Sequence, residues 1–175
     1  VNAGTTTKPG SASANFGTDI DILENIAMVG APGAGGFSET GSVVVYNYSG
    51  GSLSSANTVP FSSVALSSGG GVFYDYSNVE YGESVALAKS STGFFTGYSP
   101  GRGTRKTTQS NGSMSTGSFF EAYALRSSGT TSSFYLGSRE SAGERIYATA
   151  SSGDYVAFGK NNKVDIFKKD TPGGI

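Results

Sequence analysis

Three acidic residues near the start of the chain have the spacing of a small cation site. Asp19 and Asp21 lie two residues apart in a predicted strand, so both side chains face the same side of it, and Glu24 follows in the adjoining turn. Carboxylate oxygens are preferred ligands of Ca²⁺, so the spacing predicts a calcium site of two or three carboxylates. The structural alternative is an ion pair between Asp19 and a basic residue elsewhere in the chain. A second, looser group with the same ligand chemistry consists of Asp75, Glu80 and Glu83.

Catalytic chemistry is restricted by the residue types that the chain lacks. It contains no Cys, His or Trp, which excludes thiol nucleophiles, imidazole bases, disulfides, Ser-His-Asp triads and the usual structural zinc sites. A glycan hydrolase that uses two carboxylates stays open as an alternative, although Trp, the preferred sugar platform, is missing. The glycine-rich run "GAPGAGG" lacks the Lys-Ser/Thr pair of a phosphate-binding loop. We therefore expect binding without catalysis.

A polar segment from Tyr98 to Gly117 is the main candidate for a binding element. Its sequence, "YSPGRGTRKTTQSNGSMSTG", contains Arg102, Arg105 and Lys106 and has no apolar face. We interpret it as a long loop inserted between two strands. Long loops in compact domains are usually functional or disordered, and the basic side chains favour a functional role.

The elements that must position these residues are predicted to be short strands. Hydrophobic residues make up 36% of the 175 positions, charged residues only 14%, and there are 27 glycines, a balance that favours strands joined by tight turns over long helices. Residues 1–15, "VNAGTTTKPGSASAN", are typical of a linker to an upstream region, and residues 16–175 are predicted to form one β-domain. The net charge of −1 indicates no nucleic-acid partner, and the absence of a long apolar run indicates no membrane insertion.

Internal repeats organise the predicted strands. The stretch "FGTDIDILENIAMVGAPG…TGSVVVYNY" is echoed by "YGESVALAKS…TGSFFEAYAL" and more weakly by "AGERIYATASSGDYVAFGK". The copies begin at Phe16, Tyr81 and Ala142, which are 65 and 61 residues apart. These spacings exceed the length of a usual propeller blade, which is about 40–50 residues. Each copy cannot bury its apolar faces alone, so the copies are expected to pack against one another.

The order of these motifs resembles the FG-GAP repeat, the blade unit of the β-propeller in integrin α-chains and many bacterial surface proteins. Phe16–Gly17 and the Gly-Ala-Pro-Gly run at 30–33 match the residues that name the repeat. The second copy has Gly-Tyr-Ser-Pro at 97–100 in place of Gly-Ala-Pro, and the third keeps only Gly143 and Gly159. The resemblance implies an all-β, small β-propeller-like fold of three long, irregular FG-GAP-like units. The calcium cage common in the family, Asp-x-Asp-x-Asp-Gly, is absent from the corresponding hairpin.

The resemblance also indicates which end of the domain binds a ligand. In a four-stranded blade, the connection between the second and third strands lies at the same end as the connections between blades, and ligands of the family dock there. Phe37 and Glu39 from the first copy would then lie near Tyr98, Arg102 and Arg105 from the second. Aromatic and Arg side chains are enriched at interfaces, so these residues and Lys106 form the predicted binding surface.

Together these features predict an extracellular recognition module. The small, Cys-free, nearly neutral β-domain on a tether also resembles the distal receptor-binding domains of spike proteins of marine, membrane-containing icosahedral bacteriophages. That resemblance implies a location on the virion surface, attachment to a glycan or protein receptor on a bacterial host, and the rest of a spike protein as a partner through the linker. A secreted or cell-surface bacterial FG-GAP lectin or adhesin is the alternative.

Overall fold

The computed structural model describes residues 7–9, 15–33, 40–49, 52–60, 73–77, 79–89, 93, 95–128, 130–139 and 145–168. These residues form twelve strands and no helix, which confirms the all-β prediction. Among them, no helix has the length and apolar character needed to cross a membrane. The predicted linker lies largely outside the described residues, as do Phe37 and Glu39.

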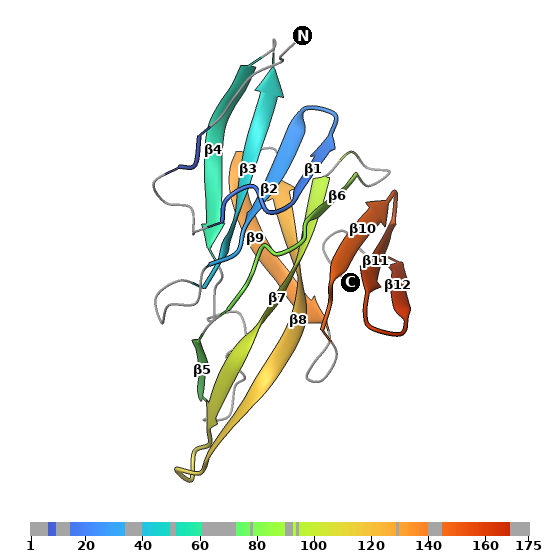
Figure 1. Cartoon of the computed structure of the whole chain (residues 1–175). Coiled ribbons are helices and arrows are strands. Elements are labelled where there is room, and N and C mark those ends of the chain that lie inside the picture. The colour runs from blue at the N-terminus through green and yellow to red at the C-terminus, as the bar shows by residue number, and fades with distance from the viewer. Residues whose placement is uncertain are drawn as a thin grey trace.

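The strands form three separate antiparallel sheets (Figure 1). The N-terminal sheet contains, in spatial order, β1 (Ile20–Leu23), β2 (Ile26–Ala31), β3 (Ser42–Ser49) and β4 (Ser52–Pro60). The central sheet contains β5 (Phe73–Ser77), β6 (Ala86–Lys89), β7 (Phe95–Thr108), β8 (Met114–Ser128) and β9 (Thr130–Arg139). Its order is β5-β7-β8-β9, with β6 paired to the same edge of β7 as β5. The C-terminal sheet contains β10 (Ala148–Ser152), β11 (Tyr155–Gly159) and β12 (Val164–Lys168).

The first strands of the three sequence repeats lie next to one another. Strand β6 contacts both β1 and β10, so the three strands lie side by side with β6 in the middle (Figure 1). Each hairpin that these strands begin is closed by a corresponding backbone hydrogen bond: from Gly17 N to Gly30 O, from Gly82 N to Pro100 O, and from Tyr147 N to Gly159 O. Tyr147 lies as far after Gly82 as Gly82 lies after Gly17, namely 65 residues. Tyr147 therefore occupies the position that the sequence alignment gave to Gly143, and the third repeat begins four residues later than predicted.

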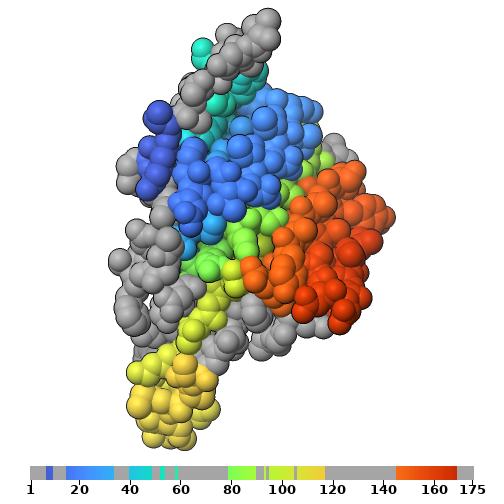
Figure 2. Space-filling view, in the orientation of Figure 1, coloured from blue at the N-terminus to red at the C-terminus, as the bar shows by residue number. Residues whose placement is uncertain are grey.

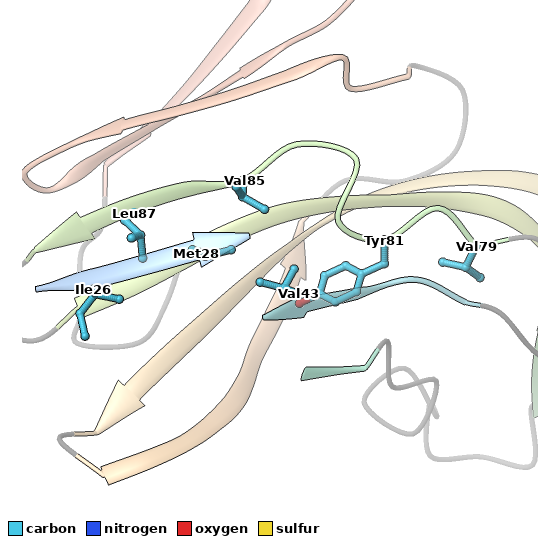
Figure 3. Close-up of a cluster of buried hydrophobic side chains, with 7 residues drawn as sticks. All are labelled: Ile26, Met28, Val43, Val79, Tyr81, Val85 and Leu87. Atoms are coloured by element: carbon cyan, nitrogen blue, oxygen red, sulfur yellow. The ribbon is translucent and has the colours of Figure 1, made fainter. Parts of the chain in front are cut away.

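One hydrophobic core joins the N-terminal and central sheets (Figure 3). Ile26 and Met28 of β2 face Leu87 of β6 and Val85 just before it. A Cβ on Gly97 of β7 would lie 2.5 Å from the Met28 sulfur, so glycine at this position makes room for the fully buried methionine. The remaining buried members of this core are Val43, Val79 and Tyr81.

Backbone segments of the first two repeats cross at three glycines. A Cβ on Gly30 would lie 2.0 Å from the carbonyl oxygen of Gly82, and one on Gly82 would lie 2.4 Å from the carbonyl oxygen of Ser42. Gly41 forms a parallel bridge with Tyr81, and both Gly41 and Gly82 have positive φ, at +82° and +97°. No other residue type fits so close a crossing. The two halves of the FG-GAP-like motif, Tyr-Gly of one copy and Gly-Ala-Pro of the preceding copy, are therefore in direct contact.

A second core joins the central and C-terminal sheets. Tyr98 of β7 and Ala88 of β6 pack with Val156 and Phe158 of β11 and with Ile146. Phe167 of β12 extends this core, with its ring centroid 5.8 Å from that of Phe158. The three sheets thus form a stack in which the central sheet is covered on both sides near β6.

Candidate functional site

The central sheet continues into an arm that projects from the molecule. Strands β7 and β8 pair without interruption from Phe95↔Ser127 to Thr108↔Met114, and β5 pairs with the distal half of β7. Figure 2 shows the described end of this arm as a yellow projection below the blue, green and orange parts of the body. The prediction of an inserted loop over Tyr98 to Gly117 is wrong, because this segment is a β-hairpin. From Arg102 to Thr108 the small and polar side chains of β7 are exposed or half-buried where described, so no apolar period reveals this part of the strand.

The tip of the arm is a five-residue turn from Gln109 to Ser113. Gln109 N donates to Ser113 O at 2.8 Å, and Gly112 N donates to Gln109 O at 2.9 Å. The Asn111 side chain accepts a hydrogen bond from Ser113 N at 2.9 Å, and Gly112 takes a φ of +82°. An Asn-Gly pair is a strong hairpin-turn signal. The dipeptide at 111–112 was therefore the sequence feature that could have identified the hairpin.

Every described side chain at the tip is exposed. The exposed run extends from Gln109 to Thr116, and Lys106 on β7 is exposed beside it. Met114 is 66% exposed, which makes it the one large hydrophobic side chain among these tip residues. Amide, hydroxyl and ammonium groups around a flexible thioether can bind hydroxyl-rich or peptide ligands.

A charged cluster lies at the base of the arm. Arg102 of β7 forms ion pairs with Glu80 and Glu83, its Nε lying 2.9 Å from Glu83 Oε2. Arg145, just before the C-terminal sheet, contacts Glu83 Oε1 at 2.5 Å and lies 4.7 Å over the ring of Tyr147. Residues of the second and third repeats are thereby linked across the sheets. Arg102 is held in this cluster, which connects the arm to the body.

The other residues predicted to bind a ligand have different locations. Tyr98 is 1% exposed in the second core, where burial, and then the charge of Asp154, raise the pKa of its hydroxyl. Its ring therefore packs between sheets and does not form part of a surface. Arg105 lies on β7 in register with Tyr76 and Gly117. Of the predicted set, Lys106 is exposed on the arm.

Asp19 and Asp21 bind backbone amides of the next repeat. They lie on the same side of the β1 segment, as predicted. Asp19 Oδ2 accepts a hydrogen bond from Val85 N at 2.8 Å, and Asp21 Oδ2 accepts one from Leu87 N at 2.6 Å. The other oxygen of each carboxylate accepts the amide of the residue that follows it, Ile20 or Ile22. The two aspartates thus supply acceptors to two strand edges at once.

The remaining acidic candidates form ion pairs. Glu24, in the turn between β1 and β2, binds Lys89 Nζ at 2.8 Å through both oxygens. Glu80 and Glu83 belong to the cluster around Arg102, and Asp75 lies on β5. In the part of the chain that the structure describes, no group of three or more acidic, Cys or His side chains is arranged to hold a metal ion. Calcium binding at either acidic group stays a prediction.

No protein-family model, curated protein or solved structure matches this chain at a significant level. The FG-GAP resemblance therefore rests on the sequence motifs and stays a prediction.

Proposed function

We propose that the chain is a surface-recognition module that attaches to a bacterial cell through the β7–β8 arm, as the distal receptor-binding domain of a viral spike would. The observation that carries this proposal is the arm itself. A hairpin with strands of 14 and 15 residues extends beyond the body and ends in a tip whose described side chains all face solvent.

The construction of the base supports this function. Arg102, Glu80, Glu83 and Arg145 connect the arm to the segments before β6 and β10 through charged hydrogen bonds, which are stronger than neutral ones. A rigid base limits the entropy lost when the tip binds a ligand. Several copies on one virion would convert weak individual contacts into strong attachment.

The body is proposed to be a propeller-like arrangement of three FG-GAP-like units. Adjacent first strands, glycine crossings between copies and hydrophobic cores between sheets support it. In this arrangement the units hold the arm in a fixed direction, and the N-terminal segment joins the module to the rest of the spike.

The test shortens the arm without disturbing its base. Residues 107–115 are replaced by Asn-Gly, which keeps the Lys106↔Thr116 pair and closes it with a two-residue turn. The fluorescently labelled chain is then measured by flow cytometry on a panel of marine bacteria and on a glycan array. We expect the shortened variant to keep its melting temperature and to lose binding.

The matched control alters a turn outside the arm. Asn161 and Asn162 are exposed between β11 and β12, so Asn162→Gly creates the same Asn-Gly dipeptide there. This variant should bind as the unchanged chain does. Undiminished binding by the folded, shortened variant would refute the role of the arm. Binding to a defined glycan alone, with none to cells, would favour the secreted lectin.

A further inference from the structure

The two junctions between sheets are built in the same direction. At the first, a β1 side chain binds the backbone of β6: Asp21 accepts a hydrogen bond from the amide of Leu87. At the second, Ser84, just before β6, accepts the amide of Thr149 on β10 at 2.9 Å. At each junction, a polar side chain on or just before the first strand of one repeat thus accepts a hydrogen bond from an amide of the first strand of the next repeat. At the second junction, Ser151 Oγ of β10 also donates to Leu87 O of β6. The junctions are head-to-tail, so each end of the stack presents a different face.

The face at the C-terminal end is apolar and exposed. Val156 and Phe158 of β11 point into the second core, which leaves the alternate residues on the outer side. On that side, Ile166, Ala157 and Ala150 lie opposite one another across three strands. Tyr155, Val164 and Ile166 are 51%, 61% and 67% exposed. A shallow cavity of about 460 Å³ lies on this face between Ala150, Tyr155 and Ile166.

At the N-terminal end, the outer side of β1 is exposed, whereas the neighbouring side chains Ala27 and Val29 of β2 are buried in a third core with Phe16. Asp21 and Leu23 of β1 face the central sheet, so Ile20 and Ile22 point the other way, 55% and 66% exposed. Of the seven large hydrophobic side chains exposed in the described residues, five lie on these two end faces. The others are Met114 and Tyr147. Exposed apolar groups that gather in patches indicate interaction sites.

We propose that the outer face of the C-terminal sheet binds the side of β1 that carries Ile20 and Ile22 in a second copy of this chain, head-to-tail. In this contact β10 of one copy would lie next to β1 of the other, as β6 lies next to β10. It would be an apolar contact, because the outer side of β10 carries Ala148 and Ala150 and the amides of Ile20 and Ile22 are already bound by aspartates of their own strand segment. Two copies joined in this way at both ends form a closed ring of six sheets. This inference does not depend on what the arm binds.

Sedimentation velocity and light scattering test the proposal with the full chain. The weight-average mass should rise with concentration from 17.8 kDa toward twice that value. Ile166→Lys and Ile22→Lys each place a charge on one end face, and each should abolish the rise. An equimolar mixture of the two variants should associate, because the unaltered C-terminal face of Ile22→Lys can bind the unaltered N-terminal face of Ile166→Lys.

Met114→Lys is the matched control, because Met114 is as exposed as Ile22 but lies at the arm tip. It should associate as the unchanged chain does, and circular dichroism confirms that every variant folds. A chain that stays at 17.8 kDa at all concentrations overturns the proposal. Association of Ile22→Lys at the unchanged level overturns it as well, because two C-terminal sheets would then pair face to face or another surface would be responsible.

Discussion

Replacing Gly82 by alanine tests whether the glycine crossing joins the first two repeats. Gly82 has a φ of +97°, and a Cβ there would lie 2.4 Å from the Ser42 carbonyl oxygen and 3.0 Å from Ala31 N. Both neighbours are backbone atoms of the N-terminal sheet. They can move only if the sheet separates from the segment that begins the second repeat.

The two costs of this substitution can be estimated separately. An L-residue in the left-handed region pays about 1–2 kcal/mol. Overpacking a well-packed interior costs a further 1–3 kcal/mol or so. We expect Gly82→Ala to lower the free energy of unfolding by about 2–5 kcal/mol, a large share of the roughly 5–15 kcal/mol of a typical domain.

Gly17 provides the matched control, since it occupies the same position in the first repeat. Its φ is +91°, and a Cβ added there would have no atom within 4 Å among the described residues. Gly17→Ala therefore carries only the conformational cost, which is about 1–2 kcal/mol. Urea unfolding followed by circular dichroism measures both variants, and unchanged m-values would show that the unfolded states are comparable.

The difference in the free energy of unfolding between the two variants isolates the contact between repeats. We expect this difference to be about 1–3 kcal/mol, with Gly82→Ala the less stable variant. Equal losses in the two variants would refute the reasoning, because the crossing would then add nothing beyond the backbone conformation.

Three further predictions concern the charged groups. Asp21→Ala should cost about 1–3 kcal/mol because it leaves two amides without their acceptor, whereas Glu24→Ala, which breaks an exposed pair, should cost less than about 1 kcal/mol; urea unfolding measures both. A hydrogen bond from Lys160 lowers the pKa of Asp165, so the ionised carboxylate stabilises the folded chain at neutral pH. This stabilisation is lost as the pH falls through the lowered pKa. The difference in the free energy of unfolding between the unchanged chain and Asp165→Asn should therefore shrink over that pH range. If Ca²⁺ binds at the first acidic group, adding it to chelated protein raises the melting temperature and Asp19→Asn removes the rise, whereas an unchanged temperature contradicts binding.

The fold class and the first hairpin could be predicted from the sequence because their signals are local. Composition indicated an all-β chain, and the spacing of Asp19 and Asp21 placed both side chains on one side. The turn at Glu24 was also located, and the structure gives this residue a φ of +54°. Each of these features depends on neighbouring residues alone.

The distal part of the arm could not be recognised in the same way because its side chains from Lys106 to Thr116 are exposed or half-buried. Apolar periodicity reports burial, and a hairpin end without buried side chains gives no such period. Tyr98 shows the opposite problem, since its aromatic ring suits a binding surface as well as a core. Its burial depends on Val156 and Phe158, far along the chain.

The partners of the acidic residues also depend on contacts that sequence spacing does not contain. Asp19 and Asp21 bind amides 66 residues away, and Glu83 binds an Arg 62 residues away. In a sequence, two carboxylates two residues apart give the same pattern whether they bind a cation or the amides of a strand edge. Telling these two cases apart requires knowing which residues of neighbouring repeats lie opposite one another, and this alignment shifts in the third copy.

Asp19 and Asp21 also occupy the amide donors of two strand edges. Strand edges with open amide donors are templates onto which another chain can add a strand and begin to aggregate. Strand β1 pairs with β2 and β6 pairs with β7, so their facing edges would each present such donors. Asp19 and Asp21 occupy these donors with side-chain oxygens, which allows two sheets to lie close together without merging into one. Each aspartate therefore binds two amides with which a strand of another chain could otherwise pair.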